Sequence, residues 1–161
     1  MKSVRVVSSA NIIDPVLSKK STGEQRGHGR AKRPLELVHT DVGGPITPMS
    51  TGQNRYFLTF IDDFSRKTCI YFLKRKSEVF NCFKDFKAIM EKQSGCMIRT
   101  VRSDQGGEYT ANDFEAFCTQ QGIRHQTTPA YTPQLNDVAE RKNRTILDMA
   151  RSLLKAKKLP K

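Results

Sequence analysis

The sequence has no closely spaced pair of cysteines and no long apolar run. Its four cysteines stand singly among apolar neighbours, which disfavours a structural zinc site and indicates buried thiols in a reducing compartment. No stretch reaches the length of a signal peptide or a membrane span. We therefore expect a soluble intracellular protein, or a fragment of one, that does not contact a membrane.

Acidic residues are scarce at both ends of the chain, whose formal net charge is +12. Residues 1–33 carry 8 basic and 2 acidic residues, and residues 141–161 carry 8 basic and 1 acidic, whereas the middle is nearly neutral. Basic ends around a neutral body suit a polyanion, although solvated tails on an ordinary domain explain the charge equally well. We expect residues 1–33 to be a disordered basic arm and residues 34–161 to be one domain.

The order of apolar patterns predicts a mixed α/β domain. Strands are expected at 35–40, 54–61, 67–73, 97–103 and 123–127, and helices from Ser77, from a capping box at 110–113, and from Asn136 to about Lys157. A hairpin followed by strand–helix alternation predicts a five-stranded mixed sheet with helices on both faces. This is the element order of the ribonuclease H-like fold.

Three carboxylates are placed where such a fold can bring them together. Asp41 and Asp104 each end a short apolar run, and Glu140 opens the last, strongly basic helix with 35 residues separating it from Asp104. If the two strands are neighbours, Asp41 and Asp104 project at one edge of the sheet and the helix brings Glu140 there. Such a cluster can hold two Mg²⁺ or Mn²⁺ ions for chemistry on phosphodiesters. For a single aspartate at a strand end, a turn residue is the ordinary alternative.

The last helix carries a second pattern beside Glu140. At about 100° per residue, Glu140, Arg144 and Arg151 form one stripe, flanked by Asn143 and Lys155. We expect these four basic and amide residues to contact DNA phosphates, with an exposed Glu–Arg pair as the alternative. The face expected to pack on the body holds Val138, Ile146, Met149, Ala150 and Leu153.

Residues around Asp104 are expected to support the site. Gly106 and Gly107 let the chain turn sharply, and Glu108 is either an indirect support of the metal site or a loop residue. Elsewhere, Asp62 and Asp63 are expected in the hairpin turn and His125 at a strand end, while Tyr109 and Tyr131 either line a groove or pack in the core.

Residues 34–160 resemble the integrase catalytic core of copia-type LTR retrotransposons, as found in Tnt1-like Pol polyproteins of the retroviral integrase superfamily. The resemblance rests on four stretches: Leu-Glu-Leu-Val-His-Thr-Asp-Val, Gly-Gln-Asn-Arg-Tyr-Phe-Leu-Thr-Phe-Ile-Asp-Asp-Phe-Ser-Arg-Lys-Thr, Val-Arg-Ser-Asp-Gln-Gly-Gly-Glu-Tyr and Val-Ala-Glu-Arg-Lys-Asn-Arg-Thr-Ile-Leu-Asp-Met-Ala-Arg. It implies that Asp41, Asp104 and Glu140 are the metal-binding triad. It also implies that 3′ ends of element DNA are joined to target DNA by homo-oligomers, in the nucleus after a stage in a cytoplasmic particle.

Some features differ from that family. Leu135 and Asp137 stand where the family usually has Gln and Gly, and we hypothesise that Asp137 weakens turnover. We expect the His/Cys zinc module of such polyproteins to be absent from residues 1–33, and the core to lack its C-terminal helices. Two other functions stay open: a decayed, element-derived fragment that only binds DNA, and a hydrolytic ribonuclease H-like nuclease with the same metal site.

Overall fold

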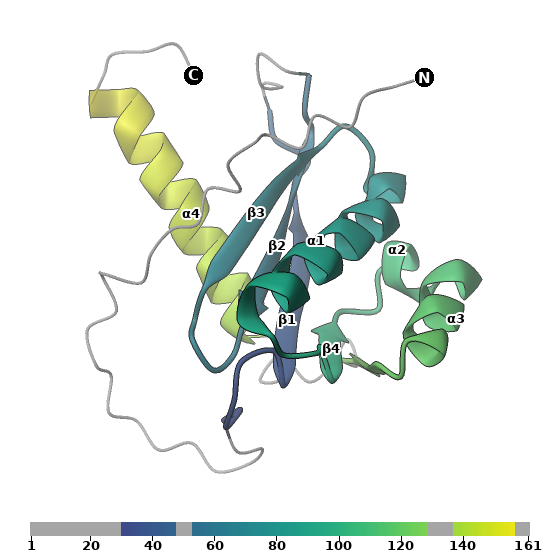
Figure 1. Cartoon of the computed structure of the whole chain (residues 1–161). Coiled ribbons are helices and arrows are strands. Elements are labelled where there is room, and N and C mark those ends of the chain that lie inside the picture. Colours follow the sequence, from purple (N-terminus) through teal and green to yellow (C-terminus); the bar gives the residue numbers. More distant parts are fainter. Residues whose placement is uncertain (1–29, 48–52, 129–136, 157–161) are drawn as a thin grey trace.

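The computed structural model describes residues 30–47, 53–128 and 137–156, and its centre is one mixed sheet (Figure 1). The strands are β1 (Leu37–Gly43), β2 (Tyr56–Asp62), β3 (Thr68–Leu73), β4 (Thr100–Ser103) and β5 (Arg124–Thr127), in the spatial order β3-β2-β1-β4-β5. β1, β2 and β3 pair antiparallel, whereas β4 runs parallel to both β1 and β5. The predicted fold class is confirmed.

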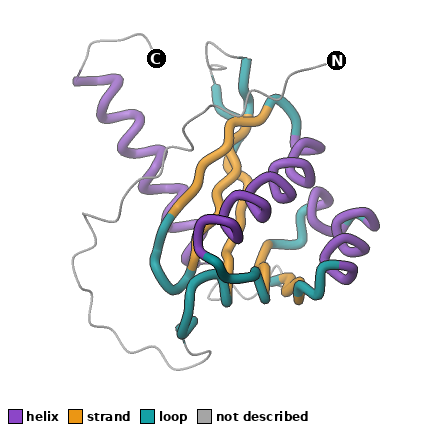
Figure 2. The backbone as a smooth tube through the Cα atoms, viewed as in Figure 1, coloured by secondary structure: helices purple, strands orange, loops and turns teal. Residues whose placement is uncertain are grey.

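Helices cover both faces of this sheet (Figures 1 and 2). The helical elements are η1 (Lys76–Glu78), α1 (Val79–Ser94), α2 (Gly107–Thr110), α3 (Asn112–Gln120) and α4 (Asp137–Ala156). Because successive strand residues point to opposite faces, Thr40 on β1 reaches Tyr109 on α2 while the next residue, Asp41, reaches Asn143 on α4. No helix within the described part of the chain is long and apolar enough to cross a membrane.

An aromatic core joins the sheet to α1 and α3. Phe60 on β2 stacks on Phe86 of α1 with ring centroids 4.3 Å apart, and Phe83 packs against Phe114 of α3 at 5.0 Å. Each such ring removes a large apolar area from water, worth about 1.5–3 kcal/mol when fully buried. The free thiols of Cys69, Cys82 and Cys118 belong to the same core, as expected, while Cys96 is only partly buried.

Several element boundaries differ from the prediction. β1 continues to Gly43 because β2 pairs with it beyond Thr40, so Asp41 lies inside the strand, opposite Thr59. Ser77 lies in η1 rather than capping a helix, and α3 begins after Ala111 with no side-chain cap. The short helix α2 was not predicted, since four residues carry too little periodicity to be recognised.

Residues on both sides of Pro34 are bonded to the hairpin turn. The backbone N–H of Ala31 donates to Asp63 at 2.8 Å and that of Leu35 donates to Asp62 at 2.9 Å. Asp62 and Asp63 do lie at the hairpin turn, as expected, but both are buried because they receive these bonds. The domain boundary at residue 34 stays a prediction, and residues 1–29 of the predicted arm lie outside the described residues.

Candidate active site

The parallel pairing of β1 with β4 brings two of the predicted carboxylates together. The register aligns Val38 with Val101 and His39 with Arg102. Continued by two residues, it places Asp104, which follows β4, beside Asp41. β1 and β4 are thus neighbours, as the prediction from the sequence required.

Asp41 lies in an environment that opposes its ionisation. Its burial, and next the negative charge of Asp104, raise its pKa to about 6, with a further contribution from Glu140. Hydrogen bonds from Asn143 and from the backbone N–H of Val42 act in the opposite direction. Asp104 and Glu140 therefore both act electrostatically on Asp41.

Asn143 is the residue that the sequence placed least accurately. It is only 6% exposed, and its amide Nδ2 donates to Asp41 Oδ2 at 2.6 Å while its Oδ1 accepts from Thr59 Oγ1 at 2.9 Å. It thus holds a catalytic candidate in place, and its expected contact with DNA phosphates stays a prediction. Ala139, one turn earlier and fully buried, shows that α4 packs through the 139/143 side of the helix.

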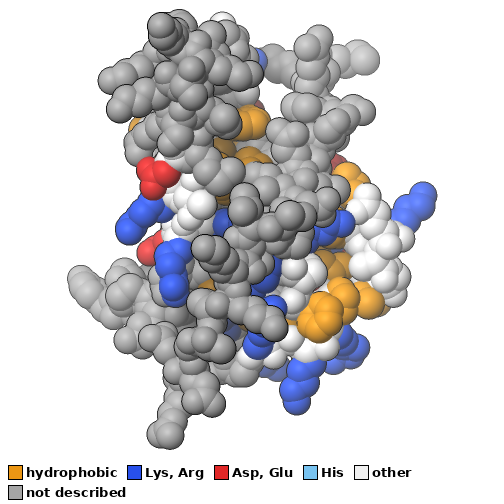
Figure 3. All heavy atoms as spheres, turned by 90° about the vertical axis from the view of Figure 1, so that its left-hand side faces the viewer, with side chains coloured by type: hydrophobic (Ala, Val, Ile, Leu, Met, Phe, Trp, Pro, Cys, Tyr) orange, Lys and Arg blue, Asp and Glu red, His pale blue; other side chains and the backbone are white. Residues whose placement is uncertain are grey.

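The outer side of α4 carries residues of the predicted basic stripe. Glu140 and Arg144 are exposed on this helix. Figure 3 shows Lys and Arg side chains scattered over the molecular face that carries α4. Arg151 and Lys155 belong to the same helix, but their side chains, like that of Asp137, lie outside the described residues, as does Leu135 altogether.

Asp104 is fixed by the chain that follows it. The backbone N–H of Gly106 donates to Asp104 Oδ1 at 3.0 Å. A Cβ at Gly106 would lie 2.8 Å from Glu108 Cδ and 3.0 Å from Asp104 Oδ1, whereas a Cβ at Gly107 would meet nothing within 4 Å. Neither glycine has a left-handed φ, so Gly106 is needed for close approach and not for the sharp turn that we expected. Glu108 forms an ion pair with Lys76 at 3.1 Å.

A second chain of hydrogen bonds holds Asp104 from the β5 side. Ser103 Oγ donates to the carbonyl of Asp104 at 2.8 Å and also contacts His125 Nε2 at 2.8 Å. His125 Nδ1 in turn contacts Glu115 on α3. This arrangement resembles a nucleophilic triad, but Ser103 is fully buried, so its hydroxyl supports Asp104 and cannot attack a substrate. His125 is hydrogen-bonded at both ring nitrogens, as expected, but it lies inside β5 and not at the end of the strand.

Tyr109 belongs to the core. Its side chain is fully buried, and its hydroxyl lies 2.9 Å from Thr40 Oγ1. Burial raises the pKa of this phenol well above its usual range. Of the two roles left open, core packing is the correct one for Tyr109, whereas Tyr131 lies outside the described residues.

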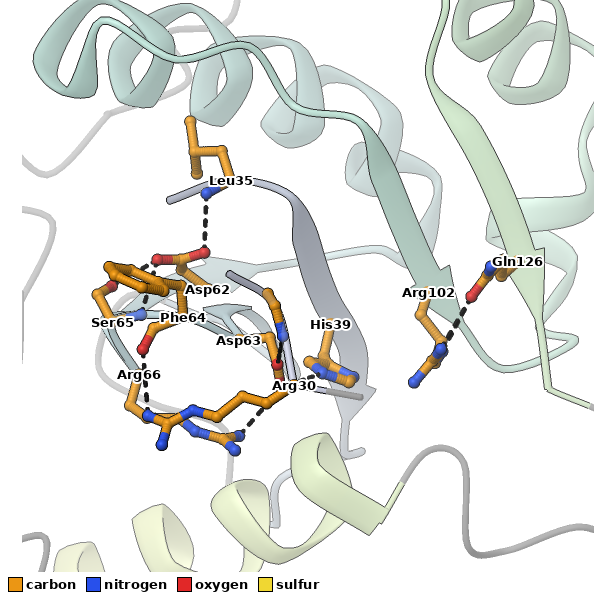
Figure 4. Close-up of polar contacts among 11 residues, drawn as sticks. Arg30, Leu35, His39, Asp62, Asp63, Phe64, Ser65, Arg66, Arg102 and Gln126 are labelled. Carbon is orange, nitrogen blue, oxygen red and sulfur yellow. Dashed lines mark hydrogen bonds and ion pairs between the residues drawn. The ribbon is translucent and has the colours of Figure 1, made fainter. Parts of the chain in front are cut away.

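A buried polar cluster at the hairpin turn was missed by sequence reasoning (Figure 4). His39 Nε2 lies 3.0 Å from Asp63 Oδ1, which Arg66 approaches to 3.3 Å. Burial alone would raise the pKa of Asp63, but bonds from His39 and the Ala31 N–H, together with the charge of Arg66, lower it to about 2. The sequence did contain one indication of this cluster. His39 lies within an apolar strand, and a buried imidazole needs a hydrogen-bond partner.

Next to this cluster lies a partly buried arginine. Arg102 on β4 directs Nε and Nη2 at Gln126 Oε1 on β5, at 3.2 and 2.9 Å. Burial lowers the pKa of its guanidinium, and the charge of Asp63 acts in the opposite direction. Figure 4 shows His39 between the Asp63 cluster and Arg102.

The donor set fits a hard divalent cation. In the described ranges, no three His, Cys, Asp or Glu side chains already stand close enough to hold a metal ion. The candidate ligands of Asp41, Asp104 and Glu140 are all carboxylate oxygens, which such cations prefer. The like charges that raise the pKa of Asp41 are those that a bound cation would neutralise.

Sheet order and paired aspartates define an integrase-type ribonuclease H-like core, and sequence comparison agrees. The family described as "Integrase core domain" matches residues 31–133, so the chain belongs to this family of DNA integrases. It is 52% identical over 127 residues to the retrovirus-related Pol polyprotein from transposon TNT 1-94 of Nicotiana tabacum, and 39% identical over 132 residues to that from transposon RE2 of Arabidopsis thaliana. The predicted resemblance to a retrotransposon integrase core is confirmed.

These matches cover 79% and 81% of the chain but only 10% and 9% of the two relatives, so the chain spans about a tenth of their length. Solved structures agree in fold. A simian T-cell lymphotropic virus intasome matches 89% of this chain and 50% of its own at a TM-score of 0.68 and 21% identity. The HTLV-2 integrase catalytic core domain in complex with magnesium, in its dimeric form, matches 79% and 77% at 0.58 and 18% identity.

Proposed function

We propose that the chain is the catalytic core of a retrotransposon integrase, which joins 3′ ends of element DNA to target DNA by polynucleotidyl transfer. This proposal rests on the parallel pairing of β1 with β4, which places Asp41 beside Asp104. The negative charge of Glu140 also helps to raise the pKa of Asp41. Membership in the integrase core domain family supports the reaction class.

Asp41, Asp104 and Glu140 would hold Mg²⁺ or Mn²⁺, with two ions as the expected number. When bound, divalent ions activate the attacking oxygen and stabilise the leaving one. The magnesium in the structure of the HTLV-2 core supports this choice of ion. Asn143, itself bonded to Thr59, orients Asp41, and the Gly106 N–H orients Asp104, which would hold both carboxylates in position for the ions.

The proposed substrate is double-stranded DNA, both the element ends and the target. Arg144 is exposed near Glu140, and Arg151 and Lys155 continue the basic sequence of α4. The similar viral integrases were solved as an intasome and as dimeric and trimeric forms, which supports work as a homo-oligomer. The proposed place of integration is the nucleus.

The test is joining of a labelled element-end duplex to a plasmid by the 161-residue chain with Mg²⁺ or Mn²⁺. Asp41→Asn, Asp104→Asn and Glu140→Gln should each abolish joining, whereas Asp113→Asn, an exposed carboxylate on α3, should not. Joining that survives the three substitutions would refute the site. Cleavage of RNA–DNA hybrids without joining would favour the hydrolytic nuclease, and salt-dependent DNA binding without any metal-dependent reaction would favour the decayed fragment.

A further inference from the structure

The sheet presents two rows of side chains on the face that α4 covers in part. The upper row is Asp41, which lies inside β1, and Asp104, which directly follows β4. Two residues earlier on the same strands, and therefore on the same face, lie His39 and Arg102, which are paired in the register. Gln126 on β5 extends this lower row, because it is paired with Arg102.

The guanidinium of Arg102 is held in one orientation without a charged partner. Two of its five N–H donors are directed at the neutral amide oxygen of Gln126. Among the described residues Arg102 forms no ion pair, since Asp63 is bonded instead to His39, Arg66 and the Ala31 N–H. A partly buried cation without a carboxylate is costly unless an anion satisfies it.

We propose that Arg102, oriented by Gln126, binds a backbone phosphate of the DNA substrate next to the phosphate at Asp41 and Asp104. This inference rests on the proposed function, because it takes the carboxylate row as the place of the reacting phosphate. The two rows are about 6.6 Å apart along the strands, so one DNA strand can contact both. Within the described part of the chain the other three guanidinium donors have no hydrogen-bond partner, so they can bind a phosphate, with which arginine forms strong, charge-assisted bonds.

Arg30 and Arg66 extend the positive charge beyond His39. Both lie at the hairpin turn, where Arg66 pairs with Asp63 and Arg30 donates to the carbonyl of Phe64 at 3.2 Å (Figure 4). Asp63 pairs with Arg66 and acts on Arg102, whereas the carboxylate of Asp62 at the same turn is bonded to Leu35 and Ser65. The strip from the carboxylate row to the turn thus changes from negative to positive, which suits a strand of DNA that leaves the reacting centre.

Equilibrium DNA binding tests this assignment without any need for catalysis. Anisotropy of a fluorescent element-end duplex is measured with the full chain in EDTA over a series of salt concentrations. Arg102→Gln should weaken binding roughly 10-fold and reduce the slope of log K against log salt by about one. The matched charge loss Lys92→Gln, exposed on α1 on the opposite face, should leave the slope unchanged.

Gln126→Glu separates anion binding from a structural role. The new carboxylate would pair with Arg102, so a structural function of Arg102 would be kept or strengthened, and the melting temperature should not fall. DNA affinity should nevertheless fall as in Arg102→Gln, and in the Arg102→Gln background Gln126→Glu should add little. The remote change Gln93→Glu, exposed at the end of α1, controls for added negative charge.

An unchanged salt slope in Arg102→Gln, or full DNA affinity in Gln126→Glu, would overturn the inference and leave the proposed function standing. The inference would also be overturned if Gln126→Glu reduced DNA affinity equally in the wild type and in Arg102→Gln. Such a result would mean that the new carboxylate simply repels DNA, independently of Arg102. The expected binding pattern without joining in Mg²⁺ would refute the proposed function alone. A wild-type chain that does not bind DNA would refute both.

Discussion

Asn143 on α4 donates a hydrogen bond of 2.6 Å to Asp41 on β1, across 102 positions of sequence. The same amide accepts from Thr59 on β2, so one buried side chain ties the last helix to two strands and to a catalytic candidate. The position of α4 and the protonation of the Asp41 carboxylate therefore depend on each other.

Asn143→Ala should therefore damage both stability and reaction. It leaves Thr59 Oγ1 and Asp41 Oδ2 without their partner, which should lower the free energy of unfolding by about 1–3 kcal/mol in urea titrations. The loss of a bond that lowers the pKa of Asp41 should also reduce its ionisation at neutral pH, and with it DNA joining. Asn81→Ala, exposed on α1, is the matched control, and equal effects of the two substitutions would contradict the assigned role.

Asp41→Asn should have opposite effects on stability and on activity. It removes a charge that burial, Asp104 and Glu140 all disfavour, so the metal-free chain should melt at a higher temperature at pH 7.5. Joining should be lost. Any rise in melting temperature that Mg²⁺ produces in the wild type should disappear as well; a metal-free variant that melts lower than wild type would contradict the electrostatic account.

Gly106→Ala and Gly107→Ala make a matched pair of adjacent substitutions. The first forces a methyl group to 3.0 Å from Asp104 Oδ1, so it should reduce the rate of joining by about 10- to 100-fold through misplacement of this carboxylate. The second meets nothing within 4 Å and should leave the rate unchanged, with stability raised by up to about 1 kcal/mol. Initial rates and urea unfolding measure both, and equal rates for the two variants would exclude the close approach as the reason for Gly106.

Asp63 should contribute stability that depends on pH. Its pKa falls from 3.8 to about 2 on folding, so its contribution is fully present above pH 3.8 and is lost as the pH falls through the interval down to about 2. Asp63→Asn should lower the free energy of unfolding at pH 7 by on the order of 2 kcal/mol. Urea unfolding of both proteins should show this difference shrinking between pH 4 and 2. Asp113→Asn, in an exposed carboxylate, should change stability by less than about 0.5 kcal/mol at either pH.

The sequence was sufficient for the sheet and for the meeting of Asp41 with Asp104, because element order and parallel strand ends determine both. It was insufficient for Asn143, because the side of α4 that docks depends on a small residue, Ala139, fitting against the sheet, which apolar periodicity does not report. Contacts such as those of Arg102 with Gln126 were also out of reach, since they need the strand register. The predicted role of Glu140 stays a prediction, as do the DNA contacts of Arg144, Arg151 and Lys155.

The parallel pairing of β1 with β4 also restricts the order in which parts of the chain can fold. β1 ends at Gly43 and β4 begins at Thr100, so residues 44–99 must be synthesised before the two strands can pair. Such distant contacts close slowly compared with hairpins and helices. Asp41 is synthesised early, but Asp104 can lie beside it only after β4 has been synthesised. Its hydrogen bond from Asn143 must wait for the synthesis of α4. A nascent chain therefore completes the surroundings of Asp41 only after α4 has been synthesised, whereas the β1–β2 hairpin can form earlier.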